Sequence, residues 1–117
     1  MELTERQQRE RDEYNQRIAE SHITEVDFEH YHHRRFGPWN PYWYIYNYVQ
    51  QHYPPAESHL LSYGCGQGAN ALRYAKLGYR VSGFDISEGN IGVAQMLAEK
   101  YGYSERTDFS AQPAERL

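Results

Sequence analysis

Residues 60–68 read LLSYGCGQG, a short apolar run that passes directly into three closely spaced glycines. Such a run is typical of a buried β-strand, and glycines after it let the backbone turn sharply, because they carry no Cβ atom. A second apolar run, from Tyr79 to Phe84, stops at Asp85, which follows Gly64 by 21 positions. In a strand–turn–helix–strand unit, this spacing brings the Asp85 carboxylate to the ligand-binding end of a parallel sheet.

Helical patterns follow each of these two runs. Residues 69–77 predict a helix that ends at Gly78, and Ser87 caps a second helix that Gly102 closes. Residues 106–111 predict a third, weaker strand. The order strand, helix, strand, helix, strand over residues 58–117 predicts an α/β fold, the Rossmann-like βαβαβ half of a parallel sheet, with strand order 3-2-1.

Residues 1–57 are expected to form an N-terminal helical cap on this unit. Thr4 and Gln7 fit a capping box, which predicts a helix within residues 1–22. A second helix is expected from Thr24 to Gly37-Pro38. In residues 42–53, tyrosines alternate with other residues in a way that suits a strand. The same residues also place Tyr42, Ile45, Tyr46 and Val49 on one helical face. The preceding Asn-Pro pair favours the helix.

The composition sets limits on the function. The chain has 117 residues, enough for one small domain, and its formal net charge of -4 argues against binding to nucleic acid. The longest apolar run is too short to span a membrane. The single cysteine, Cys65, excludes an internal disulfide and a multi-cysteine zinc site. We therefore expect a cytoplasmic protein that acts on a small molecule.

The glycines and Asp85 together indicate a site for a nucleoside-containing cofactor. A carboxylate has two acceptor oxygens and can accept hydrogen bonds from both hydroxyl groups of a ribose. One interpretation is a dinucleotide site of the NAD(P) type in an oxidoreductase, because Gly64, Gly66 and Ala69 satisfy the dinucleotide fingerprint with Ala at its third position.

The longer stretch favours another interpretation. Residues 60–68 resemble motif I of the class I S-adenosylmethionine-dependent methyltransferases, in particular their type 11/12-like domains. Residues 84–87, Phe-Asp-Ile-Ser, resemble the acidic motif that follows in this family, and residues 114–117, Ala-Glu-Arg-Leu, resemble the start of the segment that lines the adenine edge. The resemblance covers about residues 58–117, half of the chain.

The resemblance implies a cofactor site for S-adenosyl-L-methionine, with S-adenosyl-L-homocysteine as the product. It implies that the glycines let the backbone pass close to the methionine part and the ribose, that Asp85 binds the ribose hydroxyls, that Ile86 packs on adenine, and that the Ala114 N–H faces an adenine ring nitrogen. The cofactor-binding set on this basis is Tyr63, Gly64, Cys65, Gly66, Gly68, Asp85, Ile86, Ala114 and Glu115.

Two positions depart from the family pattern. Ser62 stands where an acid is common, two positions before the first glycine, which weakens direct support for the amino group of the methionine part. Pro113 stands where the family often has an acid that accepts from the adenine amino group. Both departures remove a carboxylate from the expected cofactor site.

The resemblance also implies that the chain holds the cofactor half of a larger sheet and is truncated at its C-terminus. No catalytic base is identified, and the first strand is expected to be an exposed edge through which copies of the chain can pair. A cofactor-binding fragment or partner subunit without methyl transfer is therefore a third interpretation.

Other chemistry-bearing residues lie in the cap. His30, His32 and His33 suggest a metal site, but the ligand count argues against one and favours packing; a histidine could also serve as the base. The tyrosines of residues 42–53 could line a substrate pocket, although packing of the helix against the sheet explains them as well.

Overall fold

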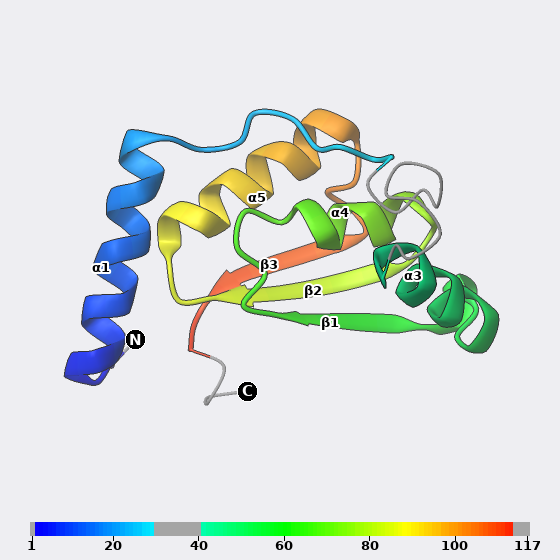
Figure 1. The fold of residues 1–117 in the computed structure, drawn as a ribbon, viewed down its shortest axis with the longest axis horizontal. Helices are drawn as coiled ribbons and strands as arrows, with labels where there is room; N and C mark the ends of the chain where they lie inside the picture. Colours follow the sequence, from blue (N-terminus) through cyan, green and yellow to red (C-terminus); the bar gives the residue numbers. More distant parts are fainter. Residues whose placement is uncertain (1, 30–40, 114–117) are drawn as a thin grey trace.

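A three-stranded parallel sheet forms the centre of the computed structural model, which describes residues 2–29 and 41–113. The strands are β1 (His59–Tyr63), β2 (Arg80–Asp85) and β3 (Thr107–Ala111), in the order β1-β2-β3. This confirms the predicted topology, with β2 in the middle (Figure 1). All three strands point the same way, so their carboxyl ends meet at one edge of the sheet.

Helices α4 (Ala69–Lys76) and α5 (Glu88–Tyr101) both cover one face of the sheet (Figure 1). They bury an apolar core against the strands, as the helical periodicity predicts. The Ser87 side chain caps α5 by accepting from the Asn90 N–H, and Gly102 ends it in the left-handed conformation. The largest apolar or aromatic side chains that are fully buried in this core are Tyr79, Leu72, Leu97 and Val81.

Gly83, in the middle of β2, lies against the core residue Phe109. A Cβ atom at position 83 would lie 2.6 Å from Phe109 Cδ1 and 3.0 Å from Cys65 Sγ. The packing of the central strand therefore requires a residue without a side chain at this position, because interiors are too densely packed to absorb an added methyl group.

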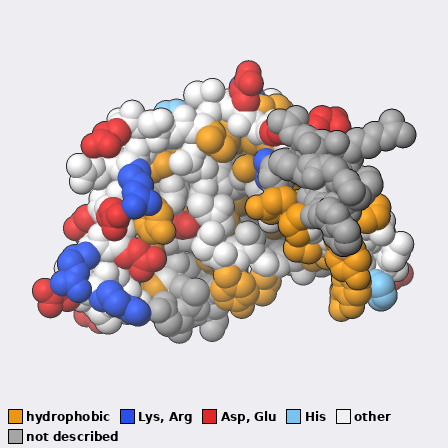
Figure 2. Space-filling view, in the orientation of Figure 1, with side chains coloured by type: hydrophobic (Ala, Val, Ile, Leu, Met, Phe, Trp, Pro, Cys, Tyr) orange, Lys and Arg blue, Asp and Glu red, His pale blue; other side chains and the backbone are white. Residues whose placement is uncertain are grey.

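Helix α1 (Glu5–Glu20) stands beside the carboxyl ends of the strands (Figure 1). Its capping box is confirmed: the Thr4 side chain accepts from the Gln7 N–H, and the Gln7 side chain accepts from the Thr4 N–H. Figure 2 shows charged side chains spread over this part of the surface. Ile18 is one of the few apolar contacts that α1 makes with the core, so the helix is held largely by polar contacts.

The helix expected to start at Thr24 is wrong for residues 24–29, which are irregular; residues 30–40 lie outside the described part of the chain. Within residues 24–29, backbone groups bond to side chains of the α/β unit instead of to a helical neighbour. The Val26 N–H donates to the Tyr101 hydroxyl, and the Asp27 carbonyl accepts from Arg73 Nε. Val26 itself is buried in the core, so long-range contacts override the local helical pattern.

Residues 42–53 form a helix, as the Asn-Pro start predicts: α3 runs over Pro41–His52 and is followed by a 3-10 turn, η1, over Pro55–Glu57. Tyr46 and Val49 face the α/β unit. Tyr42 and Ile45 fall on the same predicted helical face but are 46% and 52% exposed, so only the second half of that face is covered. Figure 2 shows apolar side chains gathered on the surface around α3. No helix in residues 2–29 and 41–113 is long and apolar enough to cross a membrane.

We expect Gly83→Ala to destabilise the fold by about 1–3 kcal/mol, because the new methyl group would overlap the Phe109 ring. The matched control is Gly92→Ala in α5, where nothing lies within 4 Å of an added Cβ. That substitution should stabilise the fold by about 0.5–1 kcal/mol through helix propensity. Urea unfolding followed by circular dichroism measures both changes, and equal effects would contradict the packing role of Gly83.

Candidate functional site

A cavity of about 420 Å³ opens at the carboxyl ends of the strands, where the sequence predicts the ligand. The glycine turn after β1 and the end of β2 form its inner wall, and α1 forms its outer wall. The inner wall contains four residues of the predicted site, namely Gly64, Gly66, Asp85 and Ile86. The outer wall contains Gln7, Glu10 and Tyr14.

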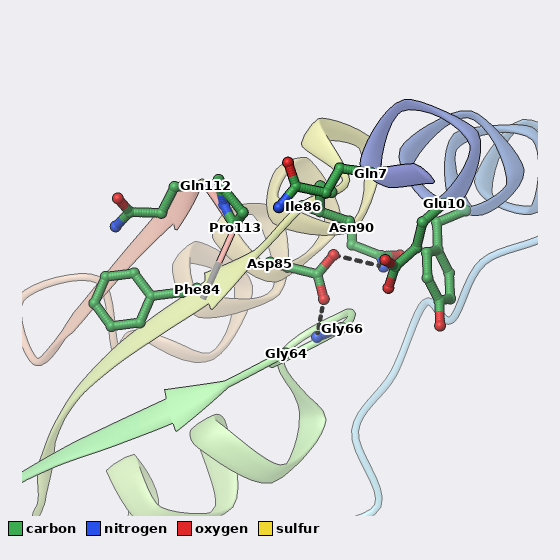
Figure 3. A pocket seen from close by; sticks show the side chains of 11 residues that line it. Gln7, Glu10, Gly64, Gly66, Phe84, Asp85, Ile86, Asn90, Gln112 and Pro113 are labelled. Atoms are coloured by element: carbon green, nitrogen blue, oxygen red, sulfur yellow. Dashed lines mark hydrogen bonds between the residues drawn. The ribbon is translucent and has the colours of Figure 1, made fainter. Parts of the chain in front are cut away.

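The Asp85 carboxylate is the most firmly fixed group of the cavity (Figure 3). Its Oδ2 accepts from the Gly66 N–H at 2.9 Å, and its Oδ1 accepts from the Ser87 N–H at 2.9 Å and from Asn90 Nδ2 at 3.3 Å. The residue is 9% exposed. A carboxylate offers about four acceptor positions, so about one is left for a ligand, and the long Asn90 bond is the easiest to exchange for another.

The three glycines of the turn after β1 have different tasks. Gly64 and Gly66 have φ angles of 59° and 58°, in the left-handed region, and an added Cβ atom at either would meet nothing within 4 Å. Their backbone is therefore open to the cavity, so that a ligand can approach it closely. Gly68 instead packs on α5, where a Cβ atom would lie 2.7 Å from Ala94 Cβ.

The other residues of the predicted cofactor set do not line this cavity in the described structure. Tyr63 is exposed, and its ring centroid lies 6.2 Å from that of Phe84. Ala114 and Glu115 lie outside the described residues, as do His30, His32 and His33. Among residues 2–29 and 41–113, no group of three His, Cys, Asp or Glu side chains is placed to hold a metal ion.

Cys65 turns its side chain inward, toward the position of Gly83. Its N–H donates to the Phe84 carbonyl at 2.9 Å, which ties the glycine turn to β2. Burial, and then the negative charge of Asp85, raise the pKa of the Cys65 thiol to about 12. The thiol therefore stays protonated at neutral pH, which fits a packing residue and not a nucleophile.

Asn15 joins α1 to the turn that carries Asp85, a contact that sequence reasoning did not find. Its Oδ1 accepts from Ser87 Oγ at 2.5 Å and from the Gly89 N–H at 3.1 Å, and its Nδ2 donates to Glu88 Oε2 at 3.3 Å. Gly89 allows this close approach, because a Cβ atom there would lie 3.3 Å from Ile18 Cβ. Asn15 thus satisfies donors at the start of α5 from a distant helix.

The three α1 residues of the outer wall were also missed. Gln7, Glu10 and Tyr14 follow one another at intervals of three and four, so they share a helix face. That spacing was readable in the sequence. However, searches for helix faces weigh apolar residues, and this face is mostly polar.

Charge in the cavity is negative. Among its described lining residues, Glu10 and Asp85 are acidic and none is Lys or Arg. Pro113 lines the cavity without adding charge, and Ser62 lines a separate cavity of about 200 Å³ between α3, α4 and β1. Ser62 therefore does not line the candidate site, to which α1 contributes a different acid, Glu10.

Comparison with known proteins agrees with this geometry. Residues 60–117 match the family described as "Methyltransferase domain". The ubiquinone biosynthesis O-methyltransferase of Dinoroseobacter shibae (strain DSM 16493 / NCIMB 14021 / DFL 12) is 43% identical over 58 residues, 50% of this chain. A protein of Geobacillus sp. (strain WCH70) named as a methyltransferase is 36% identical over 56 residues, 48% of this chain. This chain covers 23% of the length of each of these two relatives.

A solved structure extends the likeness to the N-terminal helices. Geranyl diphosphate C-methyltransferase from Streptomyces coelicolor A3(2), in complex with Mg²⁺, geranyl diphosphate and S-adenosyl-L-homocysteine, superposes with a TM-score of 0.65. The match covers 97% of this chain and 49% of that chain, at 14% sequence identity. At this identity the likeness concerns the fold alone.

The parallel sheet, its two helices on one face and the glycine turn define a Rossmann-like α/β domain. Residues 60–117, about half of this chain, belong to the methyltransferase domain family, and this half resembles the class I S-adenosylmethionine-dependent methyltransferases. S-adenosylmethionine is the cofactor of that class. The predicted resemblance of residues 60–68 and 84–87 to the methyltransferases is confirmed by the family match.

We expect Asn15→Ala to loosen α1 from α5. The substitution removes the acceptor of Ser87 Oγ and of the Gly89 N–H, which costs about 1–3 kcal/mol for partly buried donors. Amide hydrogen exchange should show faster exchange across α1, with smaller changes in β2 and α5. Gln16→Ala is the control, since Gln16 is exposed and bonds only to Glu20 within α1 in the described contacts. Unchanged exchange in Asn15→Ala would contradict the docking role.

We expect the Cys65 thiol to react slowly with iodoacetamide at pH 8 in the folded chain. Because its pKa is raised to about 12, the reactive thiolate is scarce at that pH. Unfolding in urea removes the burial and should accelerate the reaction by a factor of at least 100, as followed by mass spectrometry. Equal rates in both states would show that the thiol is exposed and normally acidic.

Proposed function

We propose that this chain forms the cofactor-binding part of an S-adenosylmethionine-dependent methyltransferase that methylates a small molecule. Residues 58–117 supply the N-terminal half of the cofactor domain, and residues 1–57 supply its helical cap. The observation that carries the proposal is the Asp85 carboxylate, fixed beside the open backbone of Gly64 and Gly66 in a cavity whose described charges are negative.

The residues present fit the proposed cofactor. Open backbone at Gly64 and Gly66 leaves room for a ligand to lie against the turn. Asp85 keeps one acceptor position for a ribose hydroxyl. The Asn90 amide can give up its 3.3 Å bond to Asp85, which frees an acceptor position for the second ribose hydroxyl. Ile86 supplies an apolar surface next to Asp85 for a flat ring. Ala114 and Glu115 remain in the proposed set from the sequence.

The chain's own part in methyl transfer is to bind and orient. When bound, S-adenosylmethionine supplies a methyl group on a positively charged sulfur, which makes the departing thioether a good leaving group. Asp85 and the glycine turn would hold the ribose end and so restrict the orientation of the bound cofactor. Helix α1 covers the outer side of the cavity and limits the access of water. We assign no catalytic base.

The dinucleotide interpretation finds less support in this cavity. A pyrophosphate carries negative charge and is held by N–H groups at a helix start or by cations. The described lining residues include two carboxylates and no cation, so they would repel it. The sulfonium and ammonium groups of S-adenosylmethionine have the opposite charge. The non-catalytic interpretation differs from the proposed methyltransferase in one measurable respect, because only a methyltransferase would turn over an acceptor.

We expect S-adenosylhomocysteine to bind the chain in isothermal titration calorimetry and to raise its melting temperature, whereas NADH should do neither. Asp85→Ala should weaken binding by a factor of about 10–100, because it removes hydrogen bonds to a charged acceptor. Asp108→Ala is the matched control, since Asp108 is an exposed acid on β3 outside this cavity.

Several outcomes would count against the proposal. Binding of NADH without S-adenosylhomocysteine would support the dinucleotide interpretation. Unchanged affinity in a folded Asp85→Ala variant would refute the ribose role. Binding of the cofactor by the chain, without turnover of any acceptor by a protein that contains it, would favour a cofactor-binding subunit.

A further inference from the structure

We propose that Glu10 of α1 recognises the positive charge of the bound cofactor, and so makes the site favour S-adenosylmethionine over the uncharged thioether product. This inference rests on the proposed function and deepens it. It assigns a specificity-determining role to a residue that lies 54 positions before the glycine turn in the sequence, in a helix outside the matched family region.

The position of Glu10 is the first argument. Its side chain lines the 420 Å³ cavity from the outer wall, opposite Gly66 and Asp85 of the inner wall. Figure 3 shows the Glu10 side chain extending from α1 into the cavity. A ligand held by Asp85 would therefore have the Glu10 carboxylate on its other side.

The electrostatics of the cavity are the second argument. Two carboxylates share the cavity, and its described lining residues include no cation that would balance them. The described ion pairs of α1 use other acids: Glu5 with Arg9, Asp12 with Arg11, and Glu13 with Arg17. Like charges in one cavity repel, and a cationic ligand between them converts this repulsion into attraction.

The anchoring of α1 is the third argument. A carboxylate on a loosely held surface helix would lose entropy on being held beside a ligand and would contribute little. Here Asn15, a little more than one turn beyond Glu10, fixes α1 to Ser87 and Gly89 at the start of α5. The same turn holds Asp85 through the Ser87 N–H. The two carboxylates are therefore set at a fixed separation by one connected group of hydrogen bonds.

Substrate and product differ in the charge that Glu10 would detect. S-adenosylmethionine carries a sulfonium, an ammonium and a carboxylate, whereas S-adenosylhomocysteine has lost the sulfonium charge with the methyl group. Their shapes are otherwise nearly the same. The proposal places Glu10 on the sulfur side of the ligand, where its carboxylate would strengthen binding of the first and leave the second almost unaffected. It would then also help release the product.

The test compares affinities for both ligands in Glu10→Gln. Titration calorimetry should show S-adenosylmethionine binding weakened by a factor of about three to ten, with S-adenosylhomocysteine changed by less than about a factor of two. The analogue sinefungin, which carries an amine in place of the sulfonium, should weaken together with S-adenosylmethionine. Melting temperatures should be unchanged, because Glu10 is exposed on its helix outside the core.

Glu13→Gln is the matched control. It changes the same helix by the same charge, but Glu13 pairs with Arg17 and does not line the cavity. An equal change of the affinity ratio in both variants would overturn the proposal, since net charge alone would then act. An unchanged ratio in Glu10→Gln, with normal S-adenosylhomocysteine binding, would overturn it while leaving the proposed function intact. Failure of the unmodified chain to bind either ligand would overturn both.

Discussion

The hydrogen bonds of the Asp85 carboxylate organise the whole ligand end of this structure. One oxygen accepts from the glycine turn after β1, and the other accepts from the turn that starts α5. Two loops that would otherwise be independent are thereby held at the carboxyl ends of neighbouring strands. Because Asp85 is nearly buried, leaving these donors without it would cost much more than an exposed bond contributes. The shape of the cavity follows from this one side chain.

The residues that local chemistry controls were predictable from the sequence. Gly64 and Gly66 have positive φ angles, which glycine adopts most easily, and Asp85 ends a strand at the spacing that a βαβ unit dictates. Ser87 and Gly102 cap α5 as their residue types indicate. For the glycines and the helix caps the evidence lies within a few positions of the residue, and for Asp85 it lies in the 21-position spacing from Gly64. A single sequence is therefore sufficient to find these residues.

The features that depend on distant contacts were not predictable in the same way. Thr24 begins a pattern that is locally helical, yet Val26 is buried and its N–H bonds to Tyr101, 75 positions away. Asn15 is an ordinary polar residue within α1 until the fold brings Ser87 to it. Periodicity placed Tyr42, Ile45, Tyr46 and Val49 on one face of α3, but it could not show how much of that face the α/β unit covers. Tyr42 and Ile45 are exposed.

Helix α1 shows how polar contacts can give a helix a role in a site. Its sequence is rich in charged residues and its apolar face is thin, so little hydrophobic burial holds it, and a short isolated helix is marginal in water. Its place therefore depends on Asn15 and on the close approach at Gly89. A ligand that touches both walls of the cavity must then stabilise the docked helix, because binding to one arrangement shifts the equilibrium toward it. Binding of such a ligand and docking of α1 are therefore thermodynamically coupled.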